Sequence, residues 1–181
     1  MSSTHTQKAA SAPEAESKVA ELRRPASSLL QGEETPPTYT RIIVGHYGGP
    51  EALQVVEESL PEPKKGEVRV RVLAAGVGLP DLMMREGIHP ETPRLPFTPG
   101  WDLVGEVDRL GDGVAGIDPG QLVAALPIYG GYAEFVCLPQ QELIPVPSGL
   151  DAAEAVCLIL NYVTAYQMLT APPRSGRDSA Y

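Results

Sequence analysis

The segment EVRVRVLAAGV, residues 67–77, alternates apolar and charged side chains over its first six residues. Val68, Val70 and Val72 fall on one face of an extended chain, while Glu67 and two arginines fall on the other. Because successive side chains of a β-strand point to opposite sides, this period of two predicts a half-buried antiparallel strand. No other element is indicated so clearly by the sequence.

Further β-rich segments are separated by turns of glycine and proline, of which the chain has 18 and 19. Residues 79–89 are expected to form a short helix whose Leu82 and Met83 face the core. Two strands are expected to flank the Gly-Gly turn within 121–139. Other strands are expected in residues 41–47, 51–60, 102–111 and 142–150. Short strands at this spacing predict a mainly β fold with short helices, either a barrel or a sandwich.

One long helix is predicted at DAAEAVCLILNYVTAYQML, residues 151–169. Asp151 followed by Glu154 three residues later is typical of a helix N-terminus. The segment contains Glu154, Asn161 and Gln167, so a core helix is favoured over a membrane span. Because the helix is apolar nearly all round, it calls for burial on more than one side. Any part of this surface that is left exposed is expected to favour self-association or a protein partner.

The ends of the chain differ in composition from its middle. Residues 1–38 are rich in Ser, Ala, Pro, Glu and Thr. A segment of this kind cannot bury enough apolar surface to offset the entropy of ordering. We therefore expect a disordered tail at 1–38, a β-rich domain at 39–150, and a helix with a frayed C-terminus at 151–181. The N-terminus lacks the apolar stretch of a secretory signal.

The formal net charge is −9 at pH 7, with no cluster of Lys or Arg. Binding to nucleic acid or to an anionic membrane surface calls for such a cluster, so neither partner is expected. Cys137 and Cys157 lie in apolar runs and are expected to be buried free thiols, which fits a reducing compartment. These observations predict a soluble, cytoplasmic protein.

Five motifs follow one another along the chain: YGGPEALQVVE, GEVRVRVLAAGVGLPDLMMREG, LPFTPGWDLVGEVDRLGDGV, GGYAEFVCLP and NYVTAYQML. In this order they resemble the N-terminal half of the medium-chain dehydrogenase/reductase superfamily, and its zinc-independent quinone oxidoreductase branch in particular. The resemblance spans about Arg41 to Leu169. It implies that residues 39–150 form a GroES-like, partly open β-barrel, the substrate-side catalytic domain, with the helix after it linking to a second domain.

Metal-dependent members of the superfamily place a Cys ligand in the segment matching AAGVGLPD and a His ligand in the segment matching PGWD. Here these positions hold Gly78 and Trp101, neither of which binds zinc. Asp102 stands at the matching acidic position, but one carboxylate does not make a metal site. The segment 105–126 contains no Cys, so the structural zinc lobe is missing too. The resemblance therefore implies a protein without zinc.

Without a metal, the chemistry of the family is hydride transfer from NADPH to a quinone or an enone. The resemblance implies that Trp101 and Asp102 bind the substrate and that Gly78, Asn161 and Thr164 lie at the cofactor. Two alternatives stay open: Trp101 as a rim aromatic that covers the core, and Thr164 as an ordinary helix residue bonded back to a carbonyl. No catalytic residue is assigned.

This sequence departs from the quinone reductase pattern at two positions near the nicotinamide. Gly78 stands where Asn is usual, and Met83 stands where Tyr is frequent. Asp81 matches a common acidic residue of the family, and a structural capping role is favoured for it over catalysis.

The chain has no G-x-G-x-x-G turn between a strand and a helix, the motif that holds the cofactor pyrophosphate. We therefore expect the chain alone to bind NADPH weakly or not at all. Three interpretations stay open: a truncated oxidoreductase-like protein that carries the substrate-side domain, a GroES-like interaction module without catalysis, and half of an oxidoreductase whose other half comes from a partner chain.

Overall fold

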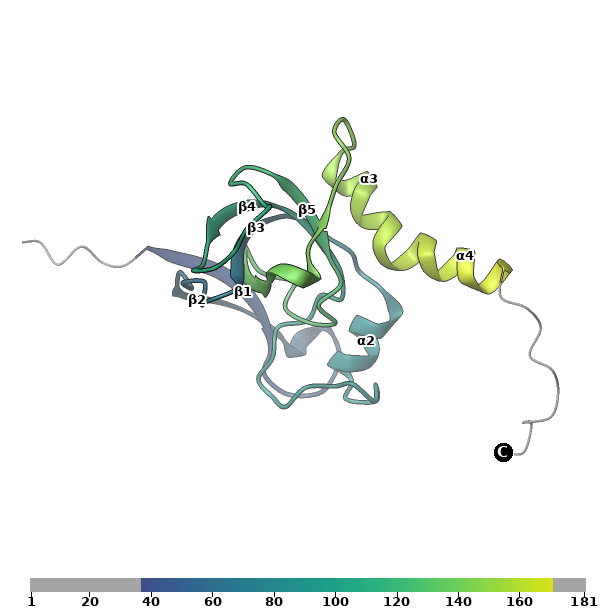
Figure 1. Cartoon of the computed structure of the whole chain (residues 1–181). Coiled ribbons are helices and arrows are strands. Elements are labelled where there is room, and N and C mark those ends of the chain that lie inside the picture. The colour runs from purple at the N-terminus through teal and green to yellow at the C-terminus, as the bar shows by residue number, and fades with distance from the viewer. Residues whose placement is uncertain (1–36, 171–181) are drawn as a thin grey trace, which may run out of the picture. The chain divides into compact units, whose positions relative to one another are not determined.

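The computed structural model describes residues 37–170, which form two antiparallel sheets, short helices and one long C-terminal helix (Figure 1). The strands are β1 (Thr38–Val44), β2 (Leu53–Ser59), β3 (Glu67–Ala75), β4 (Leu103–Leu110), β5 (Leu122–Ala125), β6 (Phe135–Pro139) and β7 (Ile144–Pro145). The helices are η2 (Pro50–Ala52), α2 (Leu79–Arg85), η3 (Gln140–Glu142), α3 (Ala152–Cys157), η4 (Leu158–Tyr162) and α4 (Val163–Thr170). The expected mainly β fold with one long C-terminal helix is confirmed.

The predicted tail lies outside the described residues except for its last two, and β1 already begins at Thr38. The predicted frayed C-terminus, from residue 171, also lies outside them.

Strands β1 and β2 pair with each other, and the other five follow the order β6-β3-β4-β5-β7. The two sheets meet through isolated bridges, Arg41 with Ala133 and Val44 with Phe97. The N–H of Val44 donates to the carbonyl of Phe97 over 2.8 Å. These few bridges join the sheets without a continuous ladder, so the barrel is open, as the resemblance implied.

Strand β3 is buried on its valine face, as predicted, and part of its charged face is buried as well. Val68 and Val70 are fully buried in the main core, which they share with Leu103 and Val123 among others. On the opposite face, Arg69 is only 7% exposed. Buried charges need paired neighbours, so its burial calls for a specific partner.

Asp108 on β4 is that partner of Arg69. The Arg69 Nε lies 2.5 Å from Asp108 Oδ2, and Nη1 donates to the carbonyl of Pro61 over 2.9 Å. Arg69 also stacks over the ring of Phe135 at 5.9 Å. The contact with Pro61 brings the segment before β3 onto the outer face of the strand, which a period-two pattern does not reveal.

Helix α2 faces the core with different residues from those expected. Asp81 and Met84 are buried, whereas Leu82 is 40% exposed and Met83 is intermediate. Positions three apart share one helix face, and the face that points inward contains the carboxylate. The prediction of Leu82 and Met83 as core residues was therefore wrong, because apolar character alone does not fix the rotation of a two-turn helix.

The two strands expected around Gly130–Gly131 do not form a hairpin. Strand β5 pairs with β4 and β7, whereas β6 pairs with β3 at the far edge of the sheet. The segment between them bonds instead to residues 98–100, for example from the N–H of Gly130 to the carbonyl of Thr98 over 2.8 Å. Glycine allows this close approach, because a Cβ on Gly131 would lie 3.0 Å from the carbonyl oxygen of Gly100.

The C-terminal helix begins where the sequence predicts. The Asp151 carboxylate accepts hydrogen bonds from the N–H groups of Ala153 (2.8 Å) and Glu154 (3.4 Å). The helix runs through a π-helical turn, η4, into α4, which is yellow in Figure 1. Such turns inside helices are frequent at functional sites.

Burial of this helix is confined to its first turns. Ala155 and Val156 pack on Val104 and Ala124, but every residue from Asn161 to Thr170 is exposed. The expected core helix is therefore not seen, because nothing in residues 37–170 covers its later turns. By length and composition alone, the 19-residue helix could also cross a membrane, a test that a helix of a soluble protein can equally pass.

The two cysteines differ from the expectation of buried thiols. Cys157 is exposed on the helix, and Cys137 is half-buried in β6. Burial raises the pKa of Cys137 to about 11, so this thiol stays neutral at physiological pH.

The Arg69–Asp108 pair should contribute measurably to stability. Substitution D108A leaves the buried Arg69 without its main partner and should lower the free energy of unfolding by about 1–3 kcal/mol, less than for a fully buried pair because Asp108 is 31% exposed. The control is E106A, which removes the exposed Arg71–Glu106 pair and should change stability by at most about 0.5 kcal/mol. Urea unfolding of both variants measures the difference, and equal losses would contradict the assigned role.

Candidate functional site

The candidate site forms where four segments meet: the end of β3, helix α2, the turn before β4 and the segment before β6. Asp81, 4% exposed, holds two of these segments together. Its Oδ2 accepts a hydrogen bond from the N–H of Gly78 and its Oδ1 accepts one from the N–H of Gly100, both over 2.9 Å. The capping role favoured for Asp81 is therefore confirmed, and the same carboxylate also fixes the neighbouring turn.

Asp102, directly before β4, is the second carboxylate of the site and is 1% exposed. Its Oδ1 accepts a hydrogen bond from the N–H of Gly76 over 3.1 Å. A Cβ on Gly76 would collide with this oxygen, so the contact requires glycine there. Its Oδ2 has no hydrogen-bond partner among residues 37–170.

The environment of Asp102 favours its protonated form. Burial raises the pKa of Asp102, and the neighbouring charge of Asp81 raises it further. The backbone of Gly76, and more weakly that of Leu160, act in the opposite direction. The balance lies above the ordinary value, because a carboxylate with an unpaired oxygen is poorly solvated in the interior.

Tyr132 completes the network from the segment before β6. Its hydroxyl donates to the carbonyl of Gly76 over 3.2 Å. Burial raises the pKa of Tyr132, and the charge of Asp81 and a hydrogen bond to Asp81 raise it further. The hydroxyl therefore stays protonated and acts as a hydrogen-bond donor at any physiological pH.

A small hollow of about 170 Å³ opens beside Asp81 and Tyr132. Its remaining wall is mostly apolar and consists of Leu53, Val77, Leu82, Arg85 and Pro99. Pockets for drug-sized ligands are usually about 300–1,000 Å³, so this hollow suits a small molecule or one end of a larger one. The arrangement offers an apolar slot with one hydroxyl donor and a nearby carboxylate.

Of the residues that the resemblance implied, Gly78 and Asp102 lie in this network. Gly78 is the N-cap of α2, and a Cβ there would lie 3.3 Å from Leu160 Cδ2. The π-helical turn of the C-terminal helix thus lies against Gly78. Asn161 follows directly in that turn, and Thr164 lies in α4; both are exposed.

Trp101 points elsewhere. Its indole packs on the cluster of Val44, Met84 and Phe97, and it meets His89 edge to face at 5.2 Å. The indole N–H is buried without a partner among residues 37–170. Trp101 is not among the residues that line the small hollow. This placement favours the alternative in which Trp101 covers the core.

Tyr132 and Gly76 were missed by the sequence analysis. Their only signal was their place in matching motifs, GGYAEF and AAGVG, since a tyrosine beside glycines and a glycine after alanines carry no chemistry by themselves. Their function depends on bonds between segments 56 residues apart, as in the Tyr132–Gly76 contact.

Metal binding finds no support in the described part of the chain. Residues 37–170 contain no group of three or more His, Cys, Asp or Glu side chains that could hold an ion.

In a comparison with known protein families, residues 64–148 match the alcohol dehydrogenase GroES-like domain. The mouse (Mus musculus) synaptic vesicle membrane protein VAT-1 homolog-like is 37% identical over 71% of this chain and 31% of its own length. Quinone oxidoreductase from Rattus norvegicus is 34% identical over 76% of this chain and 43% of its own.

Among solved structures, the quinone oxidoreductase from Escherichia coli complexed with NADPH is similar with a TM-score of 0.68 and 30% identity, covering 73% of this chain and 40% of that one. The chain thus carries a GroES-like domain of the alcohol dehydrogenase type. Its relatives in the medium-chain dehydrogenase/reductase superfamily include VAT-1 homologs and quinone oxidoreductases. It spans less than half the length of these relatives.

The raised pKa of Asp102 predicts a specific pH dependence of stability. The folded state binds this proton more tightly than the unfolded chain, whose Asp pKa is about 3.9. The stability contribution of Asp102 is therefore largest at low pH, and it falls as the pH rises from about 4 through the raised pKa.

Substitution D102N keeps an oxygen that can accept from Gly76 but cannot ionise. At pH 8 it should raise the melting temperature by about 2–4 °C over the unmodified protein, and near pH 4 the difference should vanish. The control is D112N, which replaces an exposed carboxylate and should leave the pH profile unchanged. A lower melting temperature for D102N at pH 8 would mean that the fold uses the charged form.

Proposed function

We propose that the chain is the substrate-side portion of a zinc-independent, NADPH-dependent quinone or enone reductase, with weak or no activity by itself. The observation that carries the proposal is the small apolar hollow beside the Asp81–Tyr132 network, next to Gly78 and the π-helical turn. Two relatives named quinone oxidoreductase, one of them complexed with NADPH, support the reaction class.

The residues of the hollow would bind and orient the acceptor. The apolar wall of Leu53, Val77 and Pro99 suits a flat, uncharged ring and excludes water from it. The Tyr132 hydroxyl, which stays protonated, would turn its single O–H from the Gly76 carbonyl to the acceptor carbonyl. Asp102 would contribute to acceptor binding indirectly, because it holds the backbone of Gly76, to which Tyr132 is bonded. Trp101 would contribute by packing the turn before β4 onto the core.

The cofactor contacts proposed for this chain are Gly78, Asn161 and Thr164. The last two are exposed on the surface that continues from Gly78 along the helix, so their polar groups are free to contact the nicotinamide end of NADPH. When bound, NADPH would supply the hydride. Residues 37–170 contain no glycine-rich turn leading into a helix that would cradle its phosphates.

The exposed apolar side of the C-terminal helix would bind the portion that carries the cofactor phosphates. Tyr166, Met168 and Leu169 are 68%, 79% and 86% exposed, a surface that is favourable to bury. That portion would be a further part of the same protein, a partner chain, or a second copy in a homodimer. We place the protein in the cytoplasm, with no nucleic-acid or membrane partner.

A second candidate is a GroES-like interaction module without catalysis. The same exposed helix favours it, because that surface would serve any protein partner equally well. The two functions differ in whether NADPH is needed.

Calorimetric titration with NADPH separates these functions. The 181-residue chain should show no saturable heat of binding at micromolar NADPH, because the phosphate cradle is not among its described residues. A fusion of the chain to the nucleotide-binding half of the rat quinone oxidoreductase should bind NADPH saturably in the same range. Micromolar binding by the chain alone would contradict the proposal of weak activity.

Quinone reduction by the same fusion tests the cofactor contacts. T164V and N161A should each lower kcat/KM for NADPH by about tenfold, the loss expected for one hydrogen bond to the bound cofactor. D112N, which replaces an exposed carboxylate outside the helix and the hollow, is the control and should leave kcat/KM unchanged. A fusion that folds and binds NADPH without reducing any quinone or enone would favour the interaction module.

A further inference from the structure

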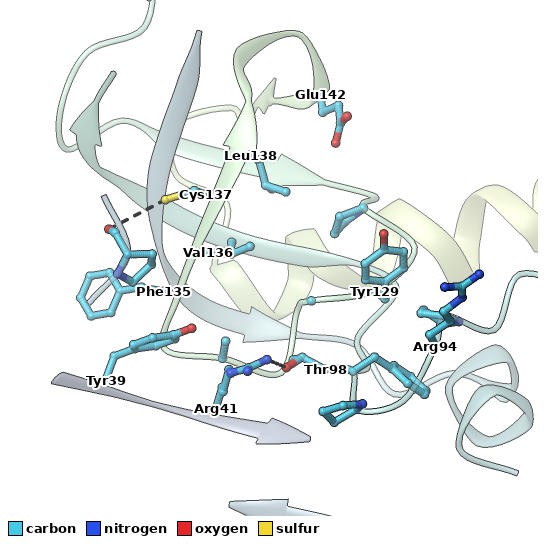
Figure 2. Close-up of a pocket in the computed structure, with 17 residues that line it drawn as sticks. Tyr39, Arg41, Arg94, Thr98, Tyr129, Phe135, Val136, Cys137, Leu138 and Glu142 are labelled. Carbon is cyan, nitrogen blue, oxygen red and sulfur yellow. Dashed lines mark hydrogen bonds between the residues drawn. The ribbon is translucent and has the colours of Figure 1, made fainter. Parts of the chain in front are cut away.

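A second and larger cavity shares no lining residue with the hollow beside Asp81, and the proposed function does not use it. Its volume is about 610 Å³, within the range of ligand sites. It is bounded by β1, the loop at 93–98, the turn at 127–130, β6 and Glu142. Figure 2 shows Val136 and Leu138 in the middle of the lining residues, with Tyr39, Arg41, Arg94 and Glu142 around them.

The walls combine an apolar floor with few polar groups. Phe97, Val136 and Leu138 form the floor together with four prolines. Cys137 also lines the cavity, but burial raises its pKa to about 11, so the thiol stays neutral and is a poor nucleophile. The cavity is therefore suited to reversible binding of an apolar body.

Arg94 is the feature that sets this cavity apart. Residues 37–170 contain six arginines, and five of them form ion pairs with Asp or Glu. The sixth, Arg94, makes no ion pair or side-chain hydrogen bond with any residue in that range. Arg94 is exposed at the wall of this cavity, so in a chain of net charge −9 its N–H donors are available to an anionic ligand.

The other arginine of the cavity is already engaged. Arg41 Nη2 lies 2.5 Å from Glu58 Oε1, and Nη1 donates to Thr98 Oγ1 over 2.8 Å. Glu142 is exposed on the rim and adds a negative charge. The lining thus has one cation unpaired within residues 37–170, Arg94, and one negative charge, Glu142. Binding of a singly charged anion is therefore favoured over binding of a dianion, which Glu142 would repel more strongly.

The turn at 127–130 is held in a fixed shape. Ile128 has a φ of +74°, a strained conformation for a β-branched residue. It is fixed by the bond from its N–H to the carbonyl of Trp101 (3.3 Å), and the bond from Gly130 to Thr98 (2.8 Å) closes the turn. A wall that is already ordered loses little entropy when a ligand binds.

We propose that this cavity is a binding site for a small amphipathic monocarboxylate, with an aromatic or branched apolar body. The carboxylate pairs with the planar guanidinium of Arg94, a geometry that allows two parallel hydrogen bonds. The apolar body lies over Val136 and Leu138, between the prolines and the ring of Tyr129. Burial raises the pKa of Tyr39, so its hydroxyl remains a donor at the other end.

Calorimetric titration of the full chain with naphthalene-2-carboxylate, and with the neutral naphthalene-2-carboxamide as its matched probe, tests the proposal without any cofactor. The carboxylate should bind saturably below about 1 mM, and the amide about tenfold more weakly. R94Q should weaken carboxylate binding about tenfold and leave amide binding unchanged. R109Q, which removes an exposed arginine paired with Glu62 outside the cavity, should bind both probes as the unmodified chain does.

A cavity-filling variant, A133F, gives an independent test because Ala133 lines the cavity. If it folds, as judged by circular dichroism, it should lose both probes. The proposal is overturned if carboxylate and amide bind equally, if R94Q retains full affinity for the carboxylate, or if neither probe binds at about 1 mM. The result is independent of the proposed reductase activity, since neither NADPH nor a quinone is present.

Discussion

The carboxylate of Asp81 is the contact on which the candidate site depends. Each of its oxygens accepts one backbone N–H, from Gly78 after β3 and from Gly100 before β4. Segments about twenty residues apart are thereby held at a fixed separation inside the protein, where a lost hydrogen bond is costly. Tyr132 and the C-terminal helix contact these same segments, at Gly76 and Gly78, and the small hollow opens beside them.

A second carboxylate, that of Asp102, lies close enough to Asp81 for the charge of Asp81 to raise its pKa. Burial raises the pKa of both Asp102 and Tyr132, and the charge of Asp81 raises both further, so Tyr132 is kept protonated. The small hollow presents one neutral hydroxyl and a mostly apolar wall, and its one arginine, Arg85, is already bound to Glu86 and to the carbonyl of Gly48. It suits an uncharged acceptor, whereas the larger cavity with its free Arg94 suits an anion. The two hollows therefore differ in the chemistry that they select.

Sequence reasoning identified the strands and the helix caps because these are local. The valines of β3 and the cap at Asp151 each depend on residues within a few positions, and both are present as expected. It erred where the answer depends on distant segments. The rotation of α2, the burial of Arg69 and the separation of β5 from β6 are all decided by which segment packs alongside, which a single-strand pattern does not encode.

The sequence by itself determined the mainly β architecture, the start of the long helix, and membership of a family through five ordered motifs. The architecture and the helix start follow from side-chain periodicity, turn chemistry and capping, which act over a few residues. The family resemblance rests on the order of the five motifs along the chain. Only the tertiary structure decided that Asp81 binds two turns at once, that Trp101 packs on the core, and that Arg94 alone among the six arginines of residues 37–170 lacks an acid within that range. These depend on distances between residues far apart in the chain, because a buried polar group takes whichever partner the packing places beside it.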